Sequence, residues 1–249
     1  MRCNKNISFL FVLLGLLAAG RAALAEGIPA KVAEIISGHE VRLENGGNLI
    51  LADIWAPLAG QPLYQESKNV LAALVKDKNL QLIRAAESQN RHGAVKGELY
   101  HNGHSITEVM LNQGWARLYP VDIYYYPKKL LALENSARQE KRGIWQNEFY
   151  AIHSATTIKA ANPPRFEMVE GKVIGIFQKK GQDAYLDFGQ DWKNDFSARI
   201  PQISQKFFTR GKMRIEELAG KNLRLRGWVF EKNGPMMEIT TPAQIEILP

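Results

Sequence analysis

The sequence predicts a protein of the α+β class, mainly β, that folds as two barrel-type units joined by a linker. β-prone segments bounded by Gly and Asn turns outnumber helical segments in both halves of the chain. Residues 152–164 between the halves are small, polar or proline-rich, which is typical of a linker. The chain has 249 residues, 45% of them hydrophobic, and is therefore long enough for two small domains with their own cores.

The first unit is expected to span residues 28–151. Leu63, Val70, Leu71 and Leu74 recur at helical spacing and predict a helix. Ser105, with Glu108 three residues later, forms the pattern of a capped helix start. The predicted strands are 31–36, 41–43, 49–54, 80–84 and 95–101, and the three predicted helices are 62–76, 105–112 and 127–141.

The second unit is expected to span residues 165–249. Its predicted order is three strands, one helix and two strands, which is the order of a five-stranded oligonucleotide/oligosaccharide-binding (OB) barrel. Gly171 and Gly175 would allow the first long strand to bend. The predicted strands are 166–177, 184–188, 196–200, 222–230 and 236–240, and the helix is 201–218.

The first 25 residues have the pattern of a secretory signal peptide. Arg2 and Lys5 precede an apolar run over 7–19, and Ala23-Leu24-Ala25 provides small residues for cleavage. The alternative is a membrane anchor, but the apolar run is shorter than the ~20 residues that a spanning helix needs. We therefore expect an exported protein, periplasmic or extracellular, with no membrane span after cleavage.

Removal of this segment changes both the thiol content and the charge of the mature chain. Cys3, the single cysteine, is removed with it, so no disulfide is expected. Three of the 32 basic residues also lie there, which leaves 29 against 25 acidic residues. This modest excess predicts at most weak binding to nucleic acid or another anionic partner.

Several segments of the first unit together resemble the staphylococcal nuclease (thermonuclease) family. They are residues 36–43, 51–57, 90–93, 109–116 and 137–145, in that order and spacing. The second unit looks like the carboxy-terminal segment of some secreted bacterial members, through residues 169–173, 185–189 and 233–239. The resemblance implies an OB-type barrel with three helices. It also implies calcium-dependent hydrolysis of nucleic acid, with calcium-binding carboxylates, a glutamate acting on water and two phosphate-binding arginines.

The residues at these family positions are not those that the chemistry requires. The first metal aspartate corresponds to His39, and the second metal carboxylate to Trp55. The two arginines correspond to Ile50 and Ala94, and the glutamate to Leu58. Losing a single oriented charge at such a site costs about 10²–10³ in rate. We therefore expect a catalytically degenerate member without a cofactor, in a non-catalytic binding or scaffold role in the cell envelope.

Two alternatives stay open. A metal-dependent phosphodiesterase or nuclease acting on DNA or RNA could use a rearranged zinc or manganese site at His39, Glu40 and Asp53, although these are more simply surface groups on adjacent strands. Nucleic-acid binding without cleavage could instead use a loop with stacking rings beside cations, although packing of this loop onto its own domain is the simpler account. Its candidate residues are Tyr124, Tyr125, Tyr126, Lys128 and Lys129.

Two features of the second unit are harder to assign. Arg224 and Arg226, with Lys221, are expected to lie on a solvated strand face or on a weak anion-binding surface. Trp192 and Trp228 are expected in core packing, with a binding face as the alternative.

Overall fold

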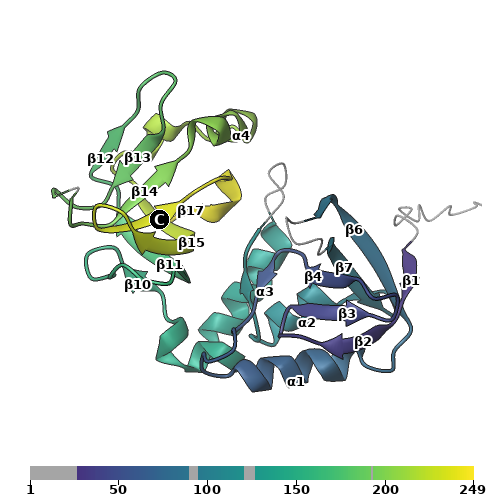
Figure 1. Ribbon diagram of the computed structural model, residues 1–249. Coiled ribbons are helices and arrows are strands. Elements are labelled where there is room, and N and C mark those ends of the chain that lie inside the picture. The colour runs from purple at the N-terminus through teal and green to yellow at the C-terminus, as the bar shows by residue number, and fades with distance from the viewer. Residues whose placement is uncertain (1–26, 90–94, 121–126, 192) are drawn as a thin grey trace, which may run out of the picture.

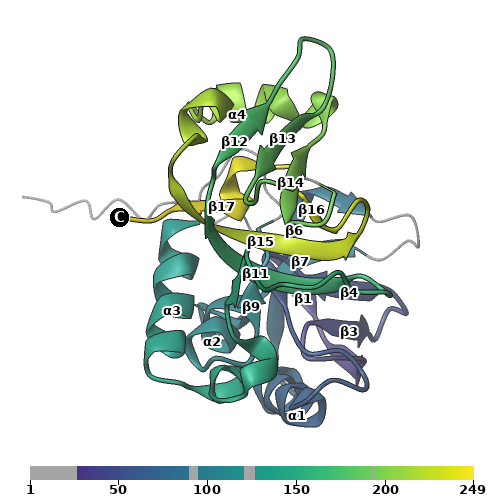
Figure 2. The same ribbon diagram turned by 90° about the vertical axis from the view of Figure 1, so that its left-hand side faces the viewer.

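In a computed structural model of the chain, residues 27–89, 95–120, 127–191 and 193–249 are described (Figure 1). They form two units that lie against each other, with helix α3 (Lys128–Gln139) beside the second unit (Figures 1 and 2). The expected signal segment, Ala94, Trp192 and the three tyrosines at 124–126 lie outside the described residues. Within the described part, no helix combines the length and apolar character needed to cross a bilayer.

Over its described residues, the first unit is a closed barrel with three α-helices, as predicted. Its sheet has the order β1-β6-β7-β4-β3-β2, and β1 and β2 are two parts of one strand bent at Lys31, so the order closes on itself. The main strands are β1 (Ile28–Ala30), β2 (Val32–Ile35), β3 (Glu40–Leu43), β4 (Asn48–Leu51), β6 (Leu80–Gln89) and β7 (Val95–His101). The shorter strands are β5 (Ile54–Trp55), β8 (His104–Ser105) and β9 (Arg117–Leu118), and the other α-helices are α1 (Tyr64–Val75) and α2 (Ile106–Asn112).

The helices are placed by local sequence and by burial. Ser105 caps α2, because its hydroxyl accepts a hydrogen bond from the Glu108 N–H. Leu71 and Val75 of α1 are fully buried against the barrel. Gly114 and Gly143 bring the end of α2 against the chain that follows α3; a Cβ at Gly114 would lie 2.3 Å from the Arg142 carbonyl oxygen.

The part of the second unit that the structure describes is a closed barrel with one α-helix. Its sheet order is β10-β11-β15-β16-β14-β13-β12, and β11 and β12 are two parts of one bent strand. The strands are β10 (His153–Ser154), β11 (Arg165–Lys172), β12 (Gly175–Phe177), β13 (Ala184–Asp187), β14 (Ser197–Ile200), β15 (Asn222–Glu231), β16 (Pro235–Glu238) and β17 (Ile245–Ile247). The helix is α4 (Gln205–Arg210), and the 3₁₀ turns of the chain are η1 (Gly143–Gln146), η2 (Glu148–Tyr150), η3 (Gln202–Ser204), η4 (Ile215–Leu218) and η5 (Pro242–Gln244).

The two barrels share one topology. Each begins with a long bent strand, continues with two antiparallel strands and a helix, and ends with a hairpin. In each, the last barrel strand pairs in parallel with the third: β7 with β4, and β16 with β14. This confirms the OB-type order expected for both units.

The structure corrects several element boundaries. The strand expected at 49–54 is two strands, because Asp53 has a φ of 62° and breaks the ladder between β4 and β5. The helix expected at 201–218 reduces to α4 and two 3₁₀ turns, since the chain turns at Lys212, whose φ is 58°. Residues 152–164, expected as a linker, contribute β10 and two buried side chains, Ala155 and Ile158, to the second core.

A small third core joins the two units. Met168 of β11 is fully buried among side chains of α3 and of the segment that follows α3 in the first unit. The buried members are Ala137, Ile144, Trp145, Tyr150 and Met168. The units are therefore in direct apolar contact as well as joined by the chain.

Candidate functional site

The position of the family's first metal aspartate lies in the tight turn between β2 and β3. Ser37, Gly38 and His39 are all buried there, and His39 is only 3% exposed. Gly38 is required by a close approach to α1, because a Cβ at this residue would lie 2.1 Å from the Ser67 hydroxyl oxygen. The turn thus holds His39 inside the protein.

Hydrogen bonds define the protonation state of His39. The Ala56 N–H donates to His39 Nδ1 over 3.3 Å, and the Ser37 hydroxyl lies 3.2 Å from the same nitrogen. Since Nδ1 accepts, the ring proton of the neutral imidazole is on Nε2. Burial lowers the pKa of His39 to about 4. His39 is therefore a neutral, packed side chain near neutral pH.

Trp55, at the position of the second metal carboxylate, packs on His39 and on the second unit. The ring centroids of His39 and Trp55 are 4.4 Å apart, and those of Trp55 and Trp228 are 4.9 Å apart at an interplanar angle of 82°. Edge-to-face contacts of this kind are favourable between aromatic rings. Tyr119 and Phe166 complete the group, which we call the aromatic cluster: His39, Trp55, Tyr119, Phe166 and Trp228.

The aromatic cluster spans the contact between the two units. Phe166 belongs to β11 and Trp228 to β15, and these residues are opposite each other in the antiparallel ladder. Trp228 also forms a side-chain hydrogen bond with Tyr119, whose pKa is raised by burial. The second barrel thus places two rings over the position that the resemblance assigns to a metal ligand.

The other family positions are apolar as well. Ile50 lies half-buried on β4, opposite Glu40 of β3 and Lys96 of β7. Leu58 is half-buried and lines a cavity of about 760 Å³ together with Gln61 and residues of the chain from 153 to 165. Ala94 lies outside the described residues.

The residues present do not fit calcium or the alternative metal site. The carboxylate of Glu40 accepts a hydrogen bond from the Asn48 side chain. His39 Nδ1 is already occupied by the Ala56 N–H. Across the described ranges, no three His, Cys, Asp or Glu side chains gather as a metal site, so His39, Glu40 and Asp53 are not brought together.

A charged pair lies buried beside the aromatic cluster. Arg117 is 2% exposed; its guanidinium lies over the Phe166 ring at 4.7 Å, and its Nη1 is 3.6 Å from Glu167 Oε2. Arg165 and His153 also contact Glu167. Burial alone would raise the pKa of Glu167, but these three partners outweigh it and lower the pKa below the ordinary value.

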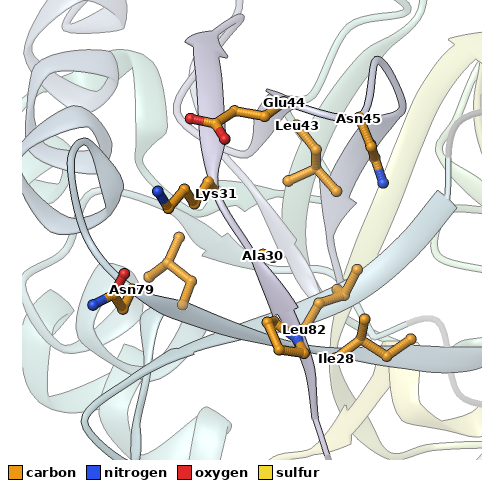
Figure 3. A pocket seen from close by; sticks show the side chains of 10 residues that line it. Ile28, Ala30, Lys31, Leu43, Glu44, Asn45, Asn79 and Leu82 are labelled. Atoms are coloured by element: carbon orange, nitrogen blue, oxygen red, sulfur yellow. The ribbon is translucent and has the colours of Figure 1, made fainter.

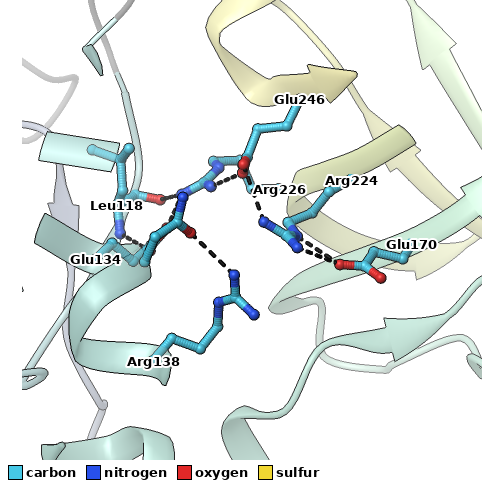
Figure 4. A network of polar contacts seen from close by, with 8 residues as sticks. Leu118, Glu134, Arg138, Glu170, Arg224, Arg226 and Glu246 are labelled. Carbon is cyan, nitrogen blue, oxygen red and sulfur yellow. Dashed lines mark hydrogen bonds and ion pairs between the residues drawn. The ribbon is translucent and has the colours of Figure 1, made fainter. Parts of the chain in front are cut away.

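A second buried network crosses between the units and is shown in Figure 4. Arg226 of β15 is fully buried and donates from Nη1 to Glu134 of α3 over 2.8 Å and to the Leu118 carbonyl over 3.1 Å. Burial alone would lower the pKa of Arg226, but Glu134 and Glu246 raise it above its ordinary value. Through Glu246 the network continues to Arg224 and Glu170.

These arginines correct the sequence-based expectation. Arg224 and Arg226 were expected on a solvated or anion-binding face, but both are buried and paired with carboxylates. The alternation of Leu223, Arg224, Leu225 and Arg226 indicates a strand with two different faces. It does not indicate that the polar face meets the other unit. The buried ion pairs of Arg117 with Glu167 and of Arg226 with Glu134 could therefore not be predicted.

Of the five residues proposed for nucleic-acid stacking, the structure describes only the two lysines at the start of α3. Lys128 and Lys129 are exposed at the start of α3, and the Lys129 ammonium pairs with Glu108 of α2. Tyr124, Tyr125 and Tyr126 lie outside the described residues.

A further cavity, of about 480 Å³, lies at the bend between β1 and β2 (Figure 3). None of the predicted site residues lines it. Its lining includes Ile28, Ala30, Lys31, Leu43, Glu44, Asn45, Asn79 and Leu82.

The first unit is an OB-type barrel with three α-helices in its described residues, and its described family positions hold His39, Ile50, Trp55 and Leu58, none of them charged near neutral pH. The arrangement of the barrel and its helices is that of the nuclease-fold class. Comparison with known families agrees: residues 45–147 match the family described as staphylococcal nuclease homologue. The first unit therefore contains a domain similar to staphylococcal nuclease. The match includes Ile50, Trp55 and Leu58 and begins after His39.

Curated relatives carry nuclease names. The chain is 33% identical over 95 residues to a staphylococcal-like nuclease, CAN1, of Arabidopsis thaliana, covering 38% of this chain and 28% of that protein. It is 26% identical over 128 residues to an uncharacterized endonuclease of Escherichia coli, covering 50% of this chain and 81% of that protein. The chain thus spans less than a third of the plant relative and most of the bacterial one.

Proposed function

We propose that this protein is a catalytically degenerate member of the family, exported to the periplasm or the cell exterior, where it has a non-catalytic binding or scaffold role. The observation that carries the proposal is the aromatic cluster. Trp55 and His39, at the two metal-ligand positions, pack against each other and beneath Trp228 of the second unit. Chemistry at a phosphodiester needs oriented charge, and these positions supply none near neutral pH.

The surroundings of the aromatic cluster support the same conclusion. The two buried arginines nearest the unit contact, Arg117 and Arg226, are directed at carboxylates of the protein. Leu58 faces a cavity lined by the chain between the units, where the family has the glutamate that acts on water. Rings of the second unit, Phe166 and Trp228, thereby lie against Trp55, which supports a role that does not depend on chemistry at this position.

A cleavage assay on the mature protein tests the proposal. The protein is incubated with single-stranded DNA and with RNA, in calcium, magnesium or manganese and with a chelator, beside an active member of the family. We expect no chelator-sensitive cleavage. Cleavage that requires metal and is lost in both His39→Ala and Asp53→Asn would establish the rearranged nuclease site and refute the proposal.

The same material separates cleavage from binding. Titration of a fluorescent DNA strand at increasing salt would show a steep loss of affinity if basic side chains contact phosphates. Salt-sensitive binding without cleavage would assign the binding role to nucleic acid, and its loss in Lys128→Ala would indicate contact through that lysine. If the fluorescence shows no binding of the DNA strand at any salt concentration, the partner is expected to be of another class and to bind at another surface.

A further inference from the structure

One end of the second barrel carries an excess of positive charge. This end is formed by the hairpin between β12 and β13, by η3 and by α4, and it lies on the side of the barrel away from β11 (Figures 1 and 2). Residues 176–183 and 201–213 contain five basic residues and one acid, Asp183, whereas the whole chain has 32 basic and 25 acidic residues. The excess is therefore concentrated here. The five basic residues are Lys179, Lys180, Lys206, Arg210 and Lys212.

Hydrogen bonds join the hairpin and the helix into one surface. The side chain of Gln205 in α4 accepts a hydrogen bond from Gln178 over 3.4 Å and donates one to the Gln182 carbonyl over 2.8 Å. The Gln202 N–H donates to Asp183 Oδ1 over 2.9 Å. Because these bonds tie both ends of the hairpin loop to η3 and α4, the basic residues of the two segments belong to a single surface.

The single acid does not neutralise this charge. Asp183 is paired with Arg199 of β14, at 2.7 Å, and Arg199 lies outside the two segments. Within the described part of the chain, no carboxylate forms an ion pair with Lys179, Lys180 or Lys206, and all three lysines are exposed. The buried arginines at the contact with the first unit, by contrast, are paired with carboxylates. The positive charge at this end is thus directed to solvent.

An aliphatic side chain is exposed among these cations. Ile203 of η3 is 70% exposed, the highest value for a large apolar side chain in the described residues. Since η3 runs directly into α4, helical spacing separates two sides of this segment: Ser204 and Phe208 are buried against the barrel, and Ile203 and Lys206 point outward. An apolar group and a cation therefore share the outward side.

The aromatic rings at this end are each accompanied by an ammonium group. Lys179 Nζ lies 5.1 Å from the centre of the Phe177 ring, and Lys206 Nζ lies 5.0 Å from the centre of the Phe207 ring. A nucleic-acid strand would need open ring faces on which its bases stack, and these cations occupy one face of each ring. Exposed cations around an aliphatic side chain are instead the composition of surfaces that lie at the interface of an anionic bilayer.

We propose that this surface docks the protein on an anionic lipid bilayer, with the lysines at the headgroup phosphates and Ile203 inserted at the boundary of the acyl chains. We call the surface the basic tip; it consists of Lys179, Lys180, Ile203, Lys206, Phe207 and Arg210. The basic tip uses none of the family positions, so the inference holds whether or not the first unit cleaves nucleic acid. Because the basic tip lies away from β11, the first unit of a docked molecule would point away from the bilayer (Figure 2).

Co-sedimentation of the mature protein with lipid vesicles tests the charge. We expect binding to vesicles of equal parts phosphatidylglycerol and phosphatidylcholine, and none to vesicles of phosphatidylcholine alone. Each basic side chain at an anionic bilayer strengthens binding about fivefold, so the triple variant Lys179→Gln, Lys180→Gln and Lys206→Gln should bind roughly a hundredfold more weakly. The matched control removes the same charge from other exposed lysines and should keep its affinity within about twofold, since distant charges are screened. It carries Lys76→Gln, Lys78→Gln and Lys159→Gln.

A fluorescent label tests the insertion of Ile203. Cys3 is expected to leave with the signal segment, so Ile203→Cys gives the mature chain a single thiol for a polarity-sensitive dye. We expect its emission to shift to the blue when the anionic vesicles are added. Ile28→Cys, at a 52% exposed position on the first unit, is the control and should show no shift. Ile203→Ser should weaken vesicle binding about tenfold.

Four results would overturn the proposal. The first is sedimentation with anionic vesicles that is no greater than with neutral ones. The second is an equal loss of binding in the two triple variants while their circular dichroism and melting match the parent. The third is an unshifted label at position 203 on vesicles that bind the protein. The fourth is a thymidine strand that binds more tightly than the vesicles and loses affinity in the triple variant of the basic tip, which would assign this surface to nucleic acid.

Discussion

Replacing Arg226 with methionine is the sharpest test of how the two units are held together. Methionine has nearly the length of arginine and no charge, so the change removes the guanidinium while filling much of its volume. It leaves Glu134 and Glu246 buried without their shared cation. It also removes the donor to the Leu118 carbonyl.

The expected loss of stability is large because both carboxylates are sequestered from water. Glu134 is fully buried and Glu246 is 8% exposed. Breaking a buried ion pair by removing one partner costs about 3–5 kcal/mol. For a chain of this size, each kcal/mol shifts the melting temperature by about 2–4 °C. Arg226→Met should therefore lower the melting temperature by roughly 6–20 °C.

Urea denaturation followed by tryptophan fluorescence measures the effect, because Trp55 and Trp228 report on the contact between the units. The double variant Arg226→Met with Glu134→Gln should recover part of the loss, since a neutral amide replaces the stranded carboxylate. Arg214→Met is the matched control. Arg214 also contacts two glutamates, but its side chain is 66% exposed, so no change in the denaturation midpoint is expected. A loss below about 1 kcal/mol for Arg226→Met would refute the reasoning.

Three further predictions concern the candidate site. His39 is neutral in the folded protein, where its pKa is about 4, against roughly 6.5 in the unfolded chain. Its contribution to the free energy of unfolding is therefore fully present above pH 6.5 and decreases by about 3 kcal/mol as the pH falls to 4; an NMR titration showing a His39 pKa near 6.5 would contradict this. Gly38→Ala should destabilise the fold by several kcal/mol, because its Cβ would collide with Ser67, whereas Gly47→Ala, whose Cβ would only reach the Asn45 side-chain oxygen at 3.4 Å, should cost less; equal melting temperatures would count against the close approach. Trp228→Ala should cost about 2 kcal/mol or more and shift Trp55 emission to the red, without producing cleavage; unchanged emission would show that Trp228 does not shield Trp55.

Local patterns allowed the main elements to be predicted. The helix start at Ser105 and Glu108 is set by a side chain bonding its own backbone, so a short sequence determines it. Hairpins with Asn-Gly turns were predicted for the same reason, and Asn102 and Gly103 have the positive φ that such turns need. The similar strand order of the two units was visible because period-two patterning is also local.

The contact between the units could not be predicted in this way. Arg226 reads as a surface residue, because only the position of α3 against β15 places Glu134 beside it. The break at Asp53 is likewise invisible in a β-prone run, since the pairing of β5 with β9 distant in sequence requires it. The residues at the family positions could be identified from the sequence, but the contact of Trp55 with Trp228 depends on a barrel more than a hundred residues away.

The contact between Trp55 and Trp228 also limits which side chains position 55 can hold. A carboxylate there would lie against an indole and beside the neutral His39, in surroundings that favour the uncharged acid. An aspartate at this position would therefore either cost stability or stay protonated near neutral pH. The second barrel thus makes position 55 tolerant of an aromatic ring and intolerant of charge.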